Sequence, residues 1–132
     1  LANAGLGVVH GLASPIGALC NIPHGVVCGT LLGEVIKTNI EQLKLENKTQ
    51  PLEKYAKVGK ILLSKHHIPN NAACDGLIEV VYSWIELMKI KKLSHYGLTI
   101  KDLEIVVKNT GLKNNPIVLN SDQIHDILVK RL

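Results

Sequence analysis

Two histidines, His10 and His24, are the residues whose type and spacing could best support chemistry. They lie in the segment GVVHGLASPIGALCNIPHGVVCGTLL (residues 7–32), and the first charged residue of the chain is Glu34. We expect imidazoles in so apolar a segment to be buried, and a buried imidazole needs a metal, a carboxylate or a carbonyl as its partner. Two interpretations stay open: one shared metal site, or two structural histidines hydrogen-bonded to backbone carbonyls.

The cysteines add possible metal ligands to this segment. Cys20 and Cys28 are close to the two histidines in sequence, whereas the third cysteine, Cys74, is remote. Their spacing matches no common zinc-finger pattern and the chain has no CxxC pair, which disfavours a Cys/His zinc site. We expect reduced thiols, as is usual for a cytoplasmic protein.

The remaining histidines are expected to be structural or exposed. His66, His67 and His95 fall at predicted helix ends, where the helix dipole favours imidazole, and His125 is predicted to face solvent. The chain has no phosphate-binding Walker loop, no GxSxG and no dinucleotide fingerprint after a strand. No pair of carboxylates stands near His10 and His24, so an anionic metal ligand would have to come from elsewhere.

Composition favours helices packed on helices and argues against nucleic-acid and membrane partners. Hydrophobic residues make up 46% of the 132 residues, aromatic residues only 3%, and Phe is absent, so the core must be aliphatic. The net charge of +4 comes from scattered lysines with a single arginine, which is poorly suited to reading bases. The apolar N-terminal run contains Pro15 and Pro23 and lacks flanking positive charges, unlike a membrane span or a signal peptide.

Helical spacing of apolar residues predicts an all-α bundle of about six helices without strands. We expect the first helix, over residues 1–12, to end at Ser14-Pro15, and Asn21 to cap a helix over residues 23–43. Further helices are predicted from residue 51, over residues 72–92, over residues 99–109 and from residue 121. The expected features of these helices are inward-facing Leu62, Leu63, Leu77, Val81, Trp84, Ile85 and Met88, a Thr99/Asp102 capping box, a stop at Gly111, and an Asn120/Gln123 cap.

The residues of the N-terminal segment also carry a family resemblance. The stretch GLGVVHGLASPIGALCNIPHGVVCGTLL resembles the second signature of the iron-containing (group III) alcohol dehydrogenases, with its His-Gly and its Pro-His-Gly opening an apolar helix. The tail is similar too, with Gly97-Leu98-Thr99, Asp102-Leu103 and Asn115-Pro116 before a short capped helix. The resemblance covers essentially residues 1–132, as the C-terminal helical metal-binding domain of the dehydroquinate synthase-like architecture.

This resemblance implies a metal-dependent, NAD(P)-dependent enzyme that interconverts alcohols and aldehydes or ketones by hydride transfer. It implies that His10 and His24 are ligands of a divalent metal, Fe²⁺ or alternatively Zn²⁺. The other two ligands, an Asp and a His, and the glycine-rich NAD(P)-binding loop belong to a preceding α/β domain that is absent here. Ser14 stands where many members have a further His near the nicotinamide, so the resemblance makes it a candidate cofactor contact.

Two expectations follow for the isolated chain. Without the dinucleotide-binding domain it should be an inactive fragment, with Leu12, Ile16, Leu19 and Ile22 lining part of the parent's substrate pocket. The alternative is a stand-alone helical module that self-associates through the small-residue helix over residues 1–12. We also expect a homo-oligomer that binds small alcohols or aldehydes but neither nucleic acid nor a membrane.

Overall fold

The computed structural model describes residues 6–110 and 115–132, and this part of the chain contains six α-helices and no β-strand. Two 3₁₀ helices, η1 (Leu93–Tyr96) and η2 (Ile100–Asp102), link α4 to α5. The α-helices are α1 (Leu6–Leu19), α2 (His24–Leu45), α3 (Thr49–Leu63), α4 (Asn70–Leu87), α5 (Leu103–Lys108) and α6 (Ser121–Lys130). The all-α prediction is confirmed.

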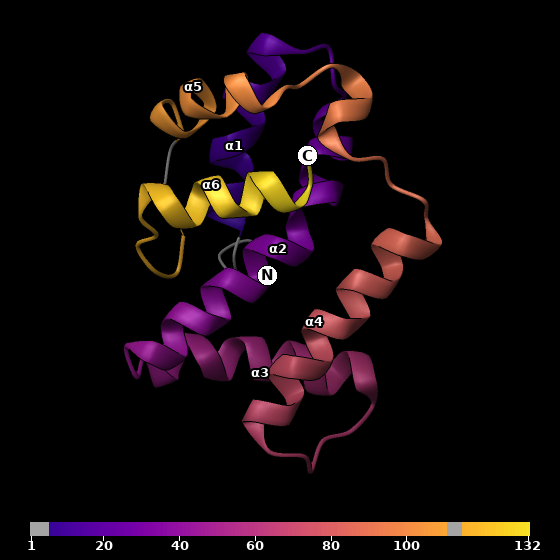
Figure 1. Cartoon of the computed structure of the whole chain (residues 1–132). Helices are drawn as coiled ribbons and strands as arrows, with labels where there is room; N and C mark the ends of the chain where they lie inside the picture. The colour runs from indigo at the N-terminus through magenta and orange to yellow at the C-terminus, as the bar shows by residue number, and fades with distance from the viewer. Residues whose placement is uncertain (1–5, 111–114) are drawn as a thin grey trace.

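The long helix α2 joins two groups of helices (Figure 1). It packs with α1 and α6, and α5 packs on both of these helices. Helix α2 also contacts α3 and α4, which form the most extensive helix pair of the described fold. None of the helices in the described part is long and apolar enough to cross a membrane.

The core is aliphatic, as the composition predicts. Leu, Ile, Val and Ala supply nearly all of it, and Tyr55 is its largest side chain. Asn39 is fully buried, and its Nδ2 donates hydrogen bonds to the Tyr55 hydroxyl (3.2 Å) and to Asn115 Oδ1 (3.1 Å). Asn115 Nδ2 returns a bond of 3.1 Å to Asn39 Oδ1. A buried amide is costly unless it is paired, so this network ties α2 to α3 and to the segment before α6.

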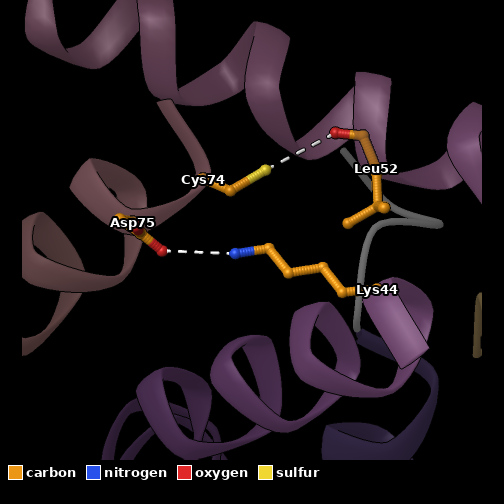
Figure 2. Close-up of polar contacts among 4 residues, drawn as sticks. All are labelled: Lys44, Leu52, Cys74 and Asp75. Atoms are coloured by element: carbon orange, nitrogen blue, oxygen red, sulfur yellow. Dashed lines mark hydrogen bonds and ion pairs between the residues drawn. The ribbon is translucent and has the colours of Figure 1, made fainter. Parts of the chain in front are cut away.

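Polar contacts hold α2, α3 and α4 together where the three helices meet (Figure 2). The thiol of buried Cys74 on α4 lies 3.6 Å from the backbone carbonyl of Leu52 on α3. Lys44 Nζ on α2 lies 3.4 Å from Asp75 Oδ1 on α4. Both charged side chains are solvent-exposed, so this ion pair contributes little beyond orientation.

Helix α1 runs through Pro15 and ends at Leu19, so the predicted break at Ser14-Pro15 is wrong. An interior proline costs a helix about 3 kcal/mol through a lost hydrogen bond and a clash. Val8, Leu12 and Ile16 are completely buried along one face of α1. Each contributes about 1.5–3 kcal/mol, so burial of this face outweighs the proline.

Three further predictions, for the start of α2 and for the buried faces of α4 and α3, are wrong at particular residues. Pro23, not Asn21, occupies the N-cap position of α2, and no side chain caps that helix.

On α4, Leu77 and Val81 are buried as predicted and Ile85 is half-buried, but Trp84 is 43% exposed and Met88 is 64% exposed. Helix α4 crosses α3 and then extends beyond it (Figure 1), and there Tyr82 and Ile85, not Trp84, lie against Gly33 of α2. Similarly, on α3 Leu63 is half-buried but Leu62 is 39% exposed.

Both predicted capping boxes are present. The backbone N–H of Thr99 donates to Asp102 Oδ2 over 2.8 Å, and a 3₁₀ turn leads from there into α5. Asn120 and Gln123 exchange bonds of 2.8 and 2.9 Å at the start of α6. The predicted stop at Gly111 lies outside the described residues.

Candidate metal centre

His10 and His24 come from different helices, and their rings stack against each other. His10 lies in the middle of α1, not at its end as predicted, because α1 continues to Leu19. His24 is the first residue of α2, as expected from Pro23. The ring centroids are 5.5 Å apart and the ring planes differ by 19°. The connection between the two helices is therefore short enough to bring both imidazoles to one place.

A third possible ligand, Cys28, joins the two histidines. Cys28 lies one helical turn after His24 on α2, and its Sγ is 3.4 Å from His24 Nε2. One ligand atom from each of His10, His24 and Cys28 can be chosen so that all lie within 4.8 Å of one another. In the described part of the chain this is the only group of three or more His, Cys, Asp or Glu residues that meets this condition.

Both histidines are exposed, so the expectation of buried imidazoles is wrong. The buried residues of this segment are the apolar ones around His10, including Val9 and Leu12, whereas the ring of His10 lies on the solvent side of α1. Cys28 is half-buried, and burial raises the pKa of its thiol above the ordinary value. The group therefore forms an open site at the surface of this chain, with two nitrogen donors and one sulfur donor.

The other residues predicted for the site, Ser14 and the four apolar pocket residues, differ from one another in burial. Ser14 is exposed one turn after His10 on α1, which places it on the same side of that helix as His10. Leu12 and Ile16 are completely buried in the core and cannot line a pocket of this chain. Of the two others, Ile22 is buried and Leu19 is 41% exposed.

The histidines outside this group match their expected roles for the most part. His66, His67 and His95 are exposed, and the ring of His95 packs edge-on against Tyr96. His125 is half-buried instead of facing solvent, in a hollow between α5 and α6.

Cys28 is not identified by zinc-finger spacing, because it belongs to no CxxC pair. The informative signal was the four-residue interval from His24 within a predicted helix, since residues at i and i+4 share one helix face. Cys20, the other nearby cysteine, does not belong to the group.

Comparison with known proteins identifies relatives of this chain. The chain is 32% identical over 134 aligned residues to an NADPH-dependent butanol dehydrogenase of Clostridium saccharobutylicum, covering 95% of this chain and 32% of that protein. It is 51% identical over 39 residues to the lactaldehyde reductase of Escherichia coli K12, covering 30% of this chain and 10% of the relative. The chain thus spans about a third of the length of the butanol dehydrogenase.

The crystal structure of a 1,3-propanediol oxidoreductase has the same fold over this region. Its TM-score is 0.76 at 21% identity, covering 95% of this chain and 32% of that structure. A model of the "Fe-containing alcohol dehydrogenase family, C-terminal" matches residues 1–132, the whole of the sequence. The chain therefore belongs to the Fe-containing alcohol dehydrogenase family and corresponds to its C-terminal region.

Proposed function

We propose that this chain is the metal-binding part of an NAD(P)-dependent alcohol dehydrogenase, with His10 and His24 as ligands of a divalent metal. The observation that carries the proposal is the stacking of these two imidazoles, 5.5 Å apart, from two separate helices. Imidazole nitrogens suit both Fe²⁺ and Zn²⁺, so the donors present fit the metals that the family resemblance implies. Alcohols and the corresponding aldehydes or ketones are the proposed substrates.

The chain's own contribution is to hold the two rings in place. The apolar face of α1, with Val8 and Leu12 fully buried, fixes the helix that carries His10. The first turn of α2 carries His24, directly after Pro23, which fixes the entry of the chain into that helix. When bound, the metal supplies Lewis-acid polarisation of the alcohol or carbonyl oxygen, and the nicotinamide exchanges the hydride.

The proposal assigns the complete reaction to a longer polypeptide. The chain covers 32% of the butanol dehydrogenase that it resembles, and both histidine rings are open to water. We propose that a preceding domain supplies the remaining ligands and the dinucleotide site, and that it covers the rings. Ser14 is a proposed contact of the nicotinamide, because it is exposed on α1 one turn from His10. We expect the 132 residues alone to oxidise no alcohol, and measured NAD(P)-dependent turnover by this chain would refute that part.

The test of the ligand assignment uses His10→Ala and His24→Ala in the complete polypeptide. We expect each substitution to remove both bound metal, measured by elemental analysis, and dehydrogenase activity against an alcohol and aldehyde panel. His67→Ala is the matched control, because His67 is also exposed but lies in the α3–α4 connection, away from the group. Full metal content in either the His10 or the His24 variant would overturn the assignment.

The alternative, a self-associating helical module, finds no support in the described part of its expected interface. Residues 1–5 lie outside the described structure, and the following residues Val8 and Val9 are completely buried within the chain's own core. These side chains are therefore not free to contact a second copy.

A further inference from the structure

We propose that a hollow between α2, the end of α4 and the C-terminal end of α6 binds a small hydroxylated organic phosphate of the polyol monophosphate class. The hollow has a volume of about 630 Å³, which is within the usual range for small-molecule sites. His10, His24 and Cys28 do not line it, so the inference goes beyond the proposed dehydrogenase function and does not depend on it. The polar lining residues that carry the argument are Glu34, Tyr82, Lys89, Lys91, Lys92 and Arg131.

Glu34 on α2 supplies a hydrogen-bond acceptor to the hollow. Its Oε2 is the only buried side-chain oxygen or nitrogen among the described residues that makes no hydrogen bond. Lys130 Nζ lies 3.9 Å from this oxygen, close enough for an ion pair but too far for a hydrogen bond. A buried acceptor without a donor is costly, and an ionised carboxylate can only accept. A ligand that fits this oxygen therefore brings a donor, which a hydroxyl group provides.

The opposite side of the hollow is basic. Three lysines lie in the segment 89–92 that follows α4, and Arg131 directly follows α6. Arg131 Nε donates to Thr30 Oγ1 on α2 over 2.9 Å, and Nη2 donates to the backbone oxygen of Ile90 over 3.3 Å. These two bonds fix the guanidinium between α2 and the lysine segment and engage only some of its N–H groups. The other N–H groups can donate to an anion in the hollow.

The balance of charge favours a phosphate monoester over an amino acid. Four basic and two acidic side chains, the latter being Glu34 and Glu86, line the hollow and give it a net charge of +2. A phosphate monoester carries a charge of about −1.5 to −2 near pH 7, whereas an amino acid zwitterion carries none. A polyol monophosphate therefore brings both the anion that the basic side attracts and the hydroxyl donor that Glu34 requires.

Tyr82 forms part of the wall between these two sides. A Cβ atom added to Gly33 would lie 2.6 Å from the Tyr82 ring, so the ring packs directly on α2 one residue before Glu34. Burial and the neighbouring Glu34 carboxylate raise the pKa of the Tyr82 hydroxyl. Tyr82 therefore keeps its proton at neutral pH and can donate a hydrogen bond within the hollow.

Isothermal titration calorimetry of the 132-residue chain with sorbitol 6-phosphate tests the inference. Inorganic phosphate and sorbitol, titrated separately, present the anion and the hydroxyl groups alone. Glu34→Leu tests the acceptor, because leucine has a similar size but accepts no hydrogen bond. Circular dichroism confirms that this variant and the lysine variants retain their helices.

A pair of triple variants tests the basic side. The test variant removes the three lysines of the hollow, by the substitutions Lys89→Gln, Lys91→Gln and Lys92→Gln. The matched control removes the same charge from exposed lysines that do not line the hollow, by the substitutions Lys54→Gln, Lys57→Gln and Lys65→Gln. General attraction of anions to a basic protein would affect both variants equally.

We expect the native chain and the control variant to bind sorbitol 6-phosphate with a Kd below about 1 mM, inorganic phosphate more weakly and sorbitol not at all. The variant without the three lysines of the hollow should bind both phosphate compounds at least about tenfold more weakly, which corresponds to the loss of one charge-assisted hydrogen bond. Glu34→Leu should weaken sorbitol 6-phosphate by about tenfold and leave inorganic phosphate as tight or tighter, because a negative charge has been removed.

Three results would overturn the inference. The first is a native chain that shows no saturable binding of sorbitol 6-phosphate, and the second is an equal loss in the two lysine variants. The third is unchanged binding of sorbitol 6-phosphate by Glu34→Leu, either in this chain or in the complete polypeptide, where it would show that a preceding domain covers the hollow. All three are independent of metal content and of alcohol oxidation, so failure here leaves the proposed function standing.

Discussion

Replacing Gly59 by alanine should destabilise the fold, although alanine is the better helix former. Gly59 is buried in α3 where this helix packs against α4. A Cβ atom added to Gly59 would lie 2.1 Å from the backbone oxygen of Ala73 and 2.8 Å from its carbonyl carbon. Ala73 is in the first turn of α4, so the obstacle is main chain and cannot move aside as a flexible side chain would.

Two opposing effects decide the size of the change. Alanine in place of an interior helical glycine gains about 1 kcal/mol of helix propensity. Over-packing a core costs about 1–3 kcal/mol and occasionally more, and an overlap of this depth with a backbone carbonyl belongs at the upper end of that range. We therefore expect a net loss of about 2 kcal/mol, because the two helices must separate to admit the methyl group.

Thermal and urea unfolding followed by circular dichroism measures this loss. For a domain of this size, 1 kcal/mol shifts the melting temperature by about 4 °C, so Gly59→Ala should melt about 8 °C lower. Gly17→Ala is the matched control: Gly17 is also helical, but nothing lies within 4 Å of its added Cβ, so this variant should be as stable as the native chain or more so. A Gly59→Ala protein at least as stable as the native chain would show that α3 and α4 do not approach as closely as described.

Two other substitutions test the caps and the buried network. Asn120→Ala removes the acceptor of the Gln123 N–H at the start of α6 and should cost about 1 kcal/mol in urea unfolding, whereas an unchanged midpoint would contradict the cap. Burial raises the pKa of the Tyr55 hydroxyl from 10.0 to about 12. The unfolded chain therefore ionises first, and stability present below pH 10 falls by at most about 1.4 kcal/mol per pH unit as the pH rises from 10 towards 12. Tyr55→Phe should lack this part of the alkaline loss, and identical pH profiles for the two proteins would refute the burial effect.

Features set by neighbours in the chain were predictable from sequence. Both capping boxes depend on two side chains at a fixed interval, Thr99 with Asp102 and Asn120 with Gln123, and both are present. Composition is also independent of how the helices are arranged. A core without Phe must be filled by Leu, Ile, Val and Ala, and this predicted helix packed on helix. These signals require no knowledge of how the helices are arranged.

Features set by packing were not predictable in this way. Whether Pro15 ends α1 depends on how much apolar surface of α1 the other helices bury, which no local pattern reveals. Trp84 and Met88 continue the spacing of Leu77 and Val81, but they are exposed, whereas Ile85 on the same part of α4 lies against Gly33 of α2. Periodicity therefore identifies an apolar face of a helix without showing which of its residues a neighbouring helix covers.

The candidate metal centre combines both kinds of information. The proximity of His24 and Cys28 follows from a four-residue interval in a helix and was available from sequence, whereas the approach of His10 depends on how α1 packs on α2. The expectation of buried histidines failed because an apolar composition is an average over a whole segment. In α1 the apolar side chains turn inward and the imidazole of His10 turns outward. The imidazoles of His10 and His24 are exposed on one surface, so water is excluded from them only when a second surface covers them. This is the physical reason to seek the rest of the proposed active site beyond these residues.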